Sequence, residues 1–340
     1  MACQSIVSMA CIALLLGALM AFPTSVQPIG VCYGTLANNL PPSSEVVELY
    51  KSNNIELMRL YYPIPDALQA LRGSNIKLLL DVPNEDLQLL ASDPSAASYW
   101  VQTNVTAYWP DVSFRYIAVG NEVMRGDKAQ YVLPAMQNIY SALSSGGLQD
   151  QIKVSTSVSQ EVLGLTFPPS HGDFSPVAKQ NLEPVVQFLL KNGAPLLVNV
   201  YPYFVYIYNK QDITNISYAL FTSSWTVVKD GQYSYQNLFD AYMDALYSAL
   251  EQIGGSAVEI VVSESGWPSA GGDSATIGNA QTYNQNLINH VSKGTPKRPG
   301  KAIEAYIFAM FNENQKPAGV EQHWGLFYPN EQPVYPIQFH

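Results

Sequence analysis

The chain has 340 residues, of which 17 are basic and 27 acidic, so its formal net charge at pH 7 is −10. This charge argues against nucleic acid or an anionic membrane as the natural partner and leaves a neutral polymer easier to accommodate. Aromatic residues make up 11% of the chain, and its 22 tyrosines suit surfaces that offer a flat ring and a hydroxyl together, although abundance alone explains them equally well.

The first predicted element is a signal peptide over residues 1–26. Residues 11–22 form an apolar run that is short for a bilayer span, and small residues follow at 24–26. We expect cleavage somewhere between residues 21 and 26, preferably after Val26, and a mature domain over 27–340. No later segment has the apolar length of a membrane helix, so the mature protein is expected to be soluble.

Cysteines and sequons fit a secreted chain. Cys3 and Cys11 lie in the predicted leader, which leaves Cys32 without an intramolecular partner. Cys32 lies inside an apolar segment with no histidine motif nearby, so we predict a small buried side chain rather than a nucleophile. Asn104 and Asn215 begin sequons that a secretory route would accept for glycosylation, although short sequons also arise by chance.

Eight apolar segments alternate with helical patterns along the rest of the chain. The expected strands cover 29–33, 57–61, 76–82, 115–122, 152–158, 196–203, 258–264 and 304–311. The expected helices cover 43–53, 65–72, 95–109, 128–144, 178–192, 237–253 and 276–293. The strands are almost continuously apolar, as a parallel sheet covered by helices requires.

This order predicts an α/β fold with a single (β/α)8 TIM barrel. The alternative is an open doubly wound sheet, but no glycine-rich dinucleotide motif follows the first strand. Residues 203–236 are too many for an ordinary loop, so we expect a small subdomain inserted after strand six beside the active face. No linker or repeat divides the chain.

Two glutamates end strands of this predicted barrel. Glu122 closes the fourth strand and Glu264 the seventh. Barrel enzymes keep their chemistry at these strand ends, so both carboxylates should project from one rim. Cleaving a glycosidic bond takes one carboxylic acid to protonate the leaving oxygen and one carboxylate to attack or stabilise the anomeric carbon. For either glutamate alone, a helix cap or a salt bridge is the alternative.

Neighbouring residues favour a carbohydrate site. Asn121 offers an amide to a sugar hydroxyl, and Trp267 lies just past a strand end, which favours a sugar contact. Tyr203 and Phe204 are further candidates for the walls of the site. For Phe308 and Phe311, packing inside the last barrel strand is the preferred interpretation.

No motif indicates a metal or a cofactor. The four histidines lack the paired spacing of a zinc site. Gly271 and Gly272 are not followed by the lysine of a phosphate loop, and neither Ser263 nor Ser265 lies in a Gly-x-Ser-x-Gly elbow.

Five segments carry a resemblance to a known family. They are residues 29–34 (IGVCYG), 118–122 (AVGNE), 199–204 (NVYPYF), 262–272 (VSESGWPSAGG) and 311–316 (FNENQK). Together they resemble the plant β-1,3-glucanases of glycoside hydrolase family 17 over essentially the whole mature chain. The resemblance implies a retaining (β/α)8 endoglucanase with Glu122 as general acid/base, Glu264 as nucleophile, and carboxyl groups about 5–5.5 Å apart.

The resemblance also implies supporting residues. Tyr201 would orient the nucleophile, Asn121 would bind the sugar beside the scissile bond, and the site would be completed by Tyr33, Glu313, Lys316 and Glu321. Alternatives stay open, because Tyr33 could belong to the core and Glu313 with Lys316 could form a structural ion pair. The sequence departs from the family pattern at Tyr62, where many relatives are acidic, and at His323.

The resulting hypothesis is an endo-1,3-β-glucanase that acts by double displacement on 1,3-β-glucan, with an acidic pH optimum. Mixed-linkage 1,3;1,4-β-glucan is the close alternative, and a non-catalytic glucan-binding barrel is the alternative from another class. We expect a monomer. The family implies roles against fungal walls or on callose. The chain ends without the extension of vacuolar relatives, so we expect export to the cell wall rather than the vacuole.

Overall fold

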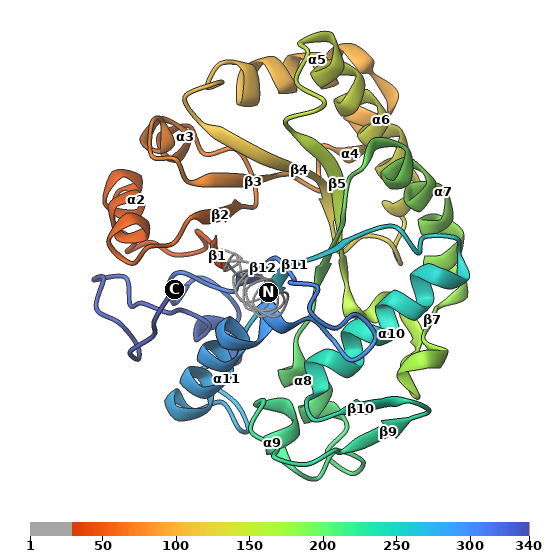
Figure 1. The fold of residues 1–340 in the computed structure, drawn as a ribbon. Coiled ribbons are helices and arrows are strands. Elements are labelled where there is room, and N and C mark those ends of the chain that lie inside the picture. The colour runs from red at the N-terminus through yellow and green to blue at the C-terminus, as the bar shows by residue number, and fades with distance from the viewer. Residues whose placement is uncertain (1–28, 340) are drawn as a thin grey trace, which may run out of the picture.

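The computed structural model describes residues 29–339 (Figure 1). The predicted signal peptide, with Cys3, Cys11 and the cleavage site, lies outside the described residues. Between 29 and 339, no helix is long and apolar enough to cross a membrane.

Eight parallel strands close into a barrel, which confirms the predicted (β/α)8 architecture. The strands follow one another around the barrel in chain order, and the last pairs with the first, Ile29 lying opposite Ala305. They are β1 (Ile29–Tyr33), β2 (Leu57–Leu60), β3 (Lys77–Val82), β4 (Ser113–Asn121), β5 (Lys153–Ser159), β8 (Leu196–Asn199), β11 (Ile260–Ser265) and β12 (Ala305–Ile307). All eight predicted strand segments take part.

Helices surround the barrel (Figure 1). They are α2 (Ser43–Ser52), α3 (Pro65–Leu71), α4 (Leu87–Ser92), α5 (Pro94–Val101), α6 (Ala129–Ser145), α7 (Pro176–Asn192), α10 (Leu238–Gln252) and α11 (Ile277–His290). Side chains at the amino termini of four of these helices accept a backbone hydrogen bond and so mark where the helices start: Asp93, Ser175, Asn237 and Thr276. The sequence did not predict α4, and the α5 prediction ran too far, because a π-helical turn (Gln102–Thr106) follows Val101.

β8 and β12 end well before their predicted carboxyl ends, for different reasons. β8 ends at Asn199 because Pro202 opens helix α8 (Pro202–Tyr208), where a missing N–H costs nothing. β12 ends at Ile307 because its ladder with β11 stops there. The Phe308 amide makes the last ladder bond, to Ser265 O at 2.8 Å, and the Ala309 amide donates instead to Trp324 O at 3.0 Å, in the carboxy-terminal segment.

The predicted subdomain after the sixth barrel strand is present, at the lower edge of Figure 1. It consists of α8, α9 (Ile216–Ala219) and an antiparallel hairpin of β9 (Val228–Asp230) and β10 (Tyr233–Tyr235). A second hairpin, β6 (Leu163–Leu165) with β7 (Asp173–Phe174), follows β5 and packs against α10. We did not predict this second hairpin.

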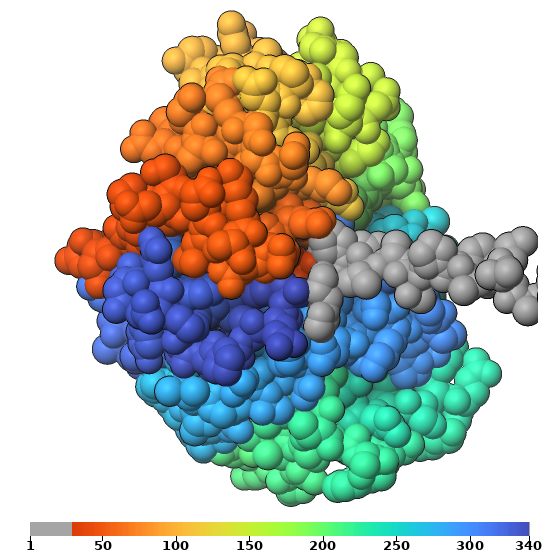
Figure 2. Space-filling model, turned by 60° about the vertical axis from the view of Figure 1, so that its left-hand side comes forward, coloured from red at the N-terminus to blue at the C-terminus, as the bar shows by residue number. Residues whose placement is uncertain are grey.

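The carboxy-terminal segment is mostly irregular and packs against the amino-terminal part of the chain. Within residues 29–339 no α-helix follows β12, only a 3-10 turn (Val320–Gln322). Figure 2 shows this blue segment against the orange-red amino-terminal part. One contact between the two is the hydrogen bond from Asn314 Nδ2 to Asn38 Oδ1, at 2.8 Å.

The cysteine prediction is confirmed, because Cys32 is free and fully buried. Asn104 is half-buried and Asn215 exposed, and their glycosylation stays a prediction.

Candidate active site

Both predicted glutamates line one cleft at an end of the barrel. The cleft has a volume of about 1110 Å³, and its walls come from the segments that follow the barrel strands and from α8. Other predicted site residues that line it are Asn121, Tyr201, Phe204, Glu313, Lys316 and Glu321. Segments hundreds of residues apart in sequence therefore meet here, because parallel barrel strands all end on one face.

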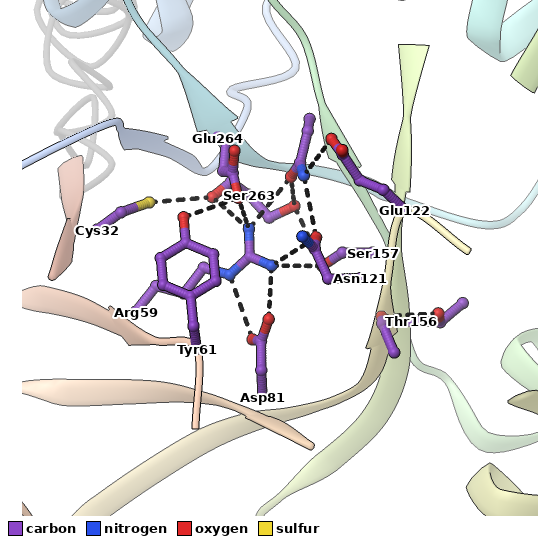
Figure 3. Close-up of polar contacts among 12 residues, drawn as sticks. Cys32, Arg59, Tyr61, Asp81, Asn121, Glu122, Thr156, Ser157, Ser263 and Glu264 are labelled. Carbon is purple, nitrogen blue, oxygen red and sulfur yellow. Dashed lines mark hydrogen bonds and ion pairs between the residues drawn. The ribbon is translucent and has the colours of Figure 1, made fainter. Parts of the chain in front are cut away.

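A fully buried arginine organises the floor of the cleft (Figure 3). Arg59, in β2, donates to Asp81 through Nε at 3.2 Å and Nη2 at 2.7 Å, and to Glu264 Oε1 through Nη1 at 2.8 Å. Burial opposes the charged guanidinium, but the carboxylates of Asp81 and Glu264 outweigh it and raise the pKa of Arg59 well above its ordinary value. The guanidinium therefore stays charged, and from β2 it holds the carboxylate of Asp81 in β3 and that of Glu264 in β11 at fixed positions.

Glu264 is held in one orientation by three donors. Its Oε1 accepts from Arg59 Nη1 and from the Tyr61 hydroxyl at 2.7 Å, and its Oε2 accepts from the Tyr201 hydroxyl at 2.6 Å. The side chain is 8% exposed. Charge-assisted bonds of this kind stabilise a carboxylate and fix its direction, so the environment of Glu264 suits a nucleophile.

Glu122 has a much sparser environment. Its Oε1 accepts one hydrogen bond, from Asn199 Nδ2 at 2.8 Å, and its backbone adopts a left-handed conformation with φ of 59°. The residue presents surface to the cleft, but the cleft walls displace part of the water around the carboxyl. This burial, then the charge of Glu264, raise the pKa of Glu122, against which the Asn199 bond acts. The environment of Glu122 suits a carboxylic acid that donates a proton.

Asn199, at the end of β8, links the two carboxylates into one network. Its Nδ2 donates to Glu122 and to Asn121 Oδ1 at 3.0 Å, while its Oδ1 accepts from Arg59 Nη1 at 3.1 Å and from Ser263 Oγ at 2.8 Å. All four hydrogen-bonding positions of this amide are thus used. The orientation of Glu122 therefore depends on the same arginine that orients Glu264.

Glu313 and Lys316 form an ion pair in the wall of the cleft. Lys316 Nζ lies 3.3 Å from Glu313 Oε2 and 4.1 Å from the centre of the Phe308 ring. Glu313 Oε1 accepts from the amide of Leu36 at 2.8 Å, which ties the segment after β12 to the segment after β1. The ion pair therefore stabilises the loops around the cleft, and both of its residues also line the cleft.

The structure corrects two predicted site residues. Trp267 is fully buried and donates to Ser274 O at 2.9 Å, so it makes no wall of the cleft. Helix α8 covers it, with the Tyr203 ring 5.1 Å away between centroids, and Tyr203 is itself buried. Tyr33 is 4% exposed and packs edge-on against Phe311, which places it in the core, the alternative left open.

Phe308 is buried as expected, at 7% exposure, and packs against Tyr61, Tyr201 and Trp324. It lies just past the end of β12, however, and also lines the cleft. Phe311 is buried as expected. Tyr62, one of the two departures from the family pattern, also lines the cleft and shares a 2.7 Å hydrogen bond with Thr35.

Sequence reasoning missed Arg59, Asp81 and Asn199. A signal was available, because Arg59 and Asp81 are opposite charges inside two consecutive apolar strands. Arg59 pairs with Leu79 in the β2–β3 register, and Asp81, two residues on, points to the same side of the sheet. Buried charges of opposite sign at such positions predict an ion pair.

Residues 29–339 match the sequence profile of glycosyl hydrolases family 17. The chain belongs to this family. It is 59% identical to a glucan endo-1,3-beta-glucosidase of Vitis vinifera over 318 residues, which are 92% of each chain. It is also 56% identical to Lichenase-2 of Hordeum vulgare over 317 residues, covering 93% of this chain and all of the relative.

Two solved structures superpose closely on this family 17 chain. One is of two plant beta-glucan endohydrolases with distinct substrate specificities, with a TM-score of 0.89, 57% identity and coverage of 92% and 100%. The other is a beta-1,3-glucanase and allergen of Cryptomeria japonica pollen, with a TM-score of 0.89, 49% identity and coverage of 92% and 99%.

Proposed function

We propose that this family 17 protein is a retaining endo-1,3-β-glucanase. The observation that carries the proposal is the contrast between Glu264, held by three donors, and Glu122, held by one donor with a raised pKa, in a single cleft. Relatives named for 1,3-β-glucan hydrolysis, at 59% identity, support the choice of linkage.

In the first step the Glu264 carboxylate attacks the anomeric carbon of a glucosyl residue. The bond from that carbon to the glycosidic oxygen breaks, and Glu122 gives its proton to the departing oxygen. A glucosyl ester of Glu264 results, and Glu122 is left ionised. The hydroxyl groups of Tyr201 and Tyr61 keep the Glu264 carboxylate oriented for this attack.

In the second step water replaces the departed sugar. Glu122 takes a proton from it, the water oxygen attacks the anomeric carbon, and the ester bond to Glu264 breaks. Two inversions at one carbon retain its configuration, and both glutamates return to their starting protonation states. This route calls for carboxyl groups about 5–5.5 Å apart.

The test measures release of reducing ends from 1,3-β-glucan, mixed-linkage glucan and 1,4-β-glucan, with the product anomer followed by NMR. The purified mature protein should cleave the 1,3-glucan and first release the β-anomer. Glu264→Gln should lose turnover but keep glucan binding, whereas Glu183→Gln, an exposed glutamate on α7, should match the wild type. Inactivity with binding intact would instead indicate a glucan-binding barrel.

Mixed-linkage glucan is a second candidate substrate, because Lichenase-2 of Hordeum vulgare matches this chain over the whole length of the relative. Faster turnover of the mixed-linkage polymer in the same assay would reassign the activity. Secretion to the cell wall and a monomeric state complete the proposal. Amino-terminal sequencing of the exported protein would test cleavage near Val26, and light scattering would test the monomer.

A further inference from the structure

A second cavity lies in the subdomain, beside the cleft. Its volume is about 680 Å³, and four segments line it. These are the loop between β6 and β7 (166–169), the stretch from α8 to α9 (205–218), the start of the β9 hairpin (227–228) and the first turns of α10 (238–242). We call it the subdomain cavity. None of the catalytic contacts described above involves its residues.

The subdomain cavity adjoins the active-site cleft. Val205, Asn209 and Tyr242 line both of them. A polymer lying in the cleft therefore passes directly beside the cavity. The cavity is bounded by four separate segments, which suits a short appendage better than a main chain that must run on past the cleavage site in both directions.

The lining of the cavity has the character of a sugar site. Phe167 is 66% exposed at its edge, and Tyr242 is half-buried in the shared wall. Asn209, Asp212 and Thr214 also line the cavity, and their side chains carry amide, carboxylate and hydroxyl groups. Flat apolar faces interspersed with hydrogen-bonding groups match the alternating apolar and hydroxylated surface of a pyranose.

Tyr218 adds a hydroxyl in need of a partner. The residue is 3% exposed and lines the cavity, and its hydroxyl oxygen is buried without a hydrogen bond. Buried hydroxyls are nearly always paired, so this one calls for an explanation. A small rotation toward a sugar hydroxyl in the cavity would give it a partner.

We propose that the subdomain cavity binds a glucosyl side branch of the glucan whose main chain lies in the cleft. This assignment rests on the proposed function and names a substrate class within it, namely 1,3-β-glucan with 6-linked glucosyl branches. The cavity would let the enzyme accept a branch near the cleavage point and draw binding energy from it.

The test uses Phe167→Ala and Tyr218→Phe, with Trp225→Ala as the matched control. Trp225 is 55% exposed on the same subdomain and lines neither the cavity nor the cleft. On a branched 1,3;1,6-β-glucan, kcat/KM should fall about threefold to tenfold in Phe167→Ala and Tyr218→Phe, the size of one lost ring contact or hydrogen bond. On linear 1,3-β-glucan all variants should match the wild type, and thermal unfolding confirms that each is folded.

Unchanged turnover of the branched polymer in both cavity variants would overturn the assignment. An equal loss on linear and branched polymers would overturn it too, because the cavity would then hold main chain. Wild-type inactivity on linear glucan would instead refute the proposed function. In that case NMR titration with a 6-linked glucose disaccharide still decides the matter, since binding should perturb the cavity residues and weaken in Phe167→Ala.

Discussion

At the scale of single residues, the site depends on one buried cation. Arg59 touches Asp81, Asn121, Asn199 and Glu264. An arginine at zero exposure is tolerable only because carboxylates neutralise it and every donor has a partner. The same bonds orient Glu264 and, through Asn199, Glu122, so the stability of the fold and the proposed activity both depend on one side chain.

Arg59→Lys separates charge from geometry. Lysine keeps the positive charge but cannot reach Asp81 and Glu264 at once. We expect a loss of about 1–3 kcal/mol in unfolding free energy and a fall in kcat of at least about tenfold, measured by urea unfolding and by glucan hydrolysis. Arg125→Lys, in the exposed pair with Glu161, should change stability by less than about 0.5 kcal/mol. Equal effects of the two changes would contradict this account.

The pKa of Glu122 predicts how the rate depends on pH. Glu122 must be protonated for the first step, so activity is present below its pKa and lost as pH rises through it. Burial and Glu264 raise that pKa above the usual value of about 4.3, which extends the active range upward from the acid side. A profile of kcat/KM against pH should fall on its alkaline limb, and a rate still climbing at pH 9 would refute the assignment.

At the scale of elements, close packing of hairpin against helix holds the added structure on the barrel. Gly172, next to β7, lies where a Cβ atom would come within 2.1 Å of the Ala245 carbonyl oxygen in α10. Only glycine permits this approach. The hairpin after β5 therefore owes its position to one missing side chain, and α10 in turn forms a wall of the subdomain cavity.

Two glycine-to-alanine changes should have opposite signs. Gly172→Ala should lower the unfolding free energy by about 1–3 kcal/mol, because the backbone of α10 must shift. Gly278→Ala, in the first turn of α11 with open space around the new methyl group, should raise it by about 0.4–1 kcal/mol. Urea titrations of the two variants measure both, and a neutral Gly172→Ala would show that α10 yields easily.

At the scale of the whole molecule, Asp244 ties three parts of the chain together. It belongs to α10, and its Oδ2 accepts from the Tyr235 hydroxyl of the subdomain and from the Lys297 amide, both at 2.9 Å. Burial raises the pKa of Asp244 to about 6, against hydrogen bonds from Thr295, Lys297 and Tyr235. The folded state therefore holds this proton more tightly than the unfolded chain, where the pKa is about 3.9.

The raised pKa of Asp244 makes the unfolding free energy depend on pH. Folding is favoured most where Asp244 is protonated, and this contribution is lost as pH rises from about 4 through about 6. Asp244→Asn mimics the protonated group, so it should remove a pH-dependent term of about 1–3 kcal/mol. Unfolding free energies at pH 4 and pH 7 for both proteins test this, and an identical pH dependence would exclude Asp244 as its source.

The sequence by itself determined the barrel and the positions of its two glutamates. Eight apolar segments bury themselves between helices whatever the loops do, and a residue that ends such a strand must lie on the active rim. The tertiary structure decided which side chains face the cleft. Trp267 is hidden because α8 folds over it, Phe308 reaches the cleft wall because β12 ends before it, and Arg59 gains its role only when strands distant in sequence converge. The hydrophobic pattern of a segment predicts whether that segment is buried. Whether a loop residue faces solvent depends on other segments of the chain that pack over it.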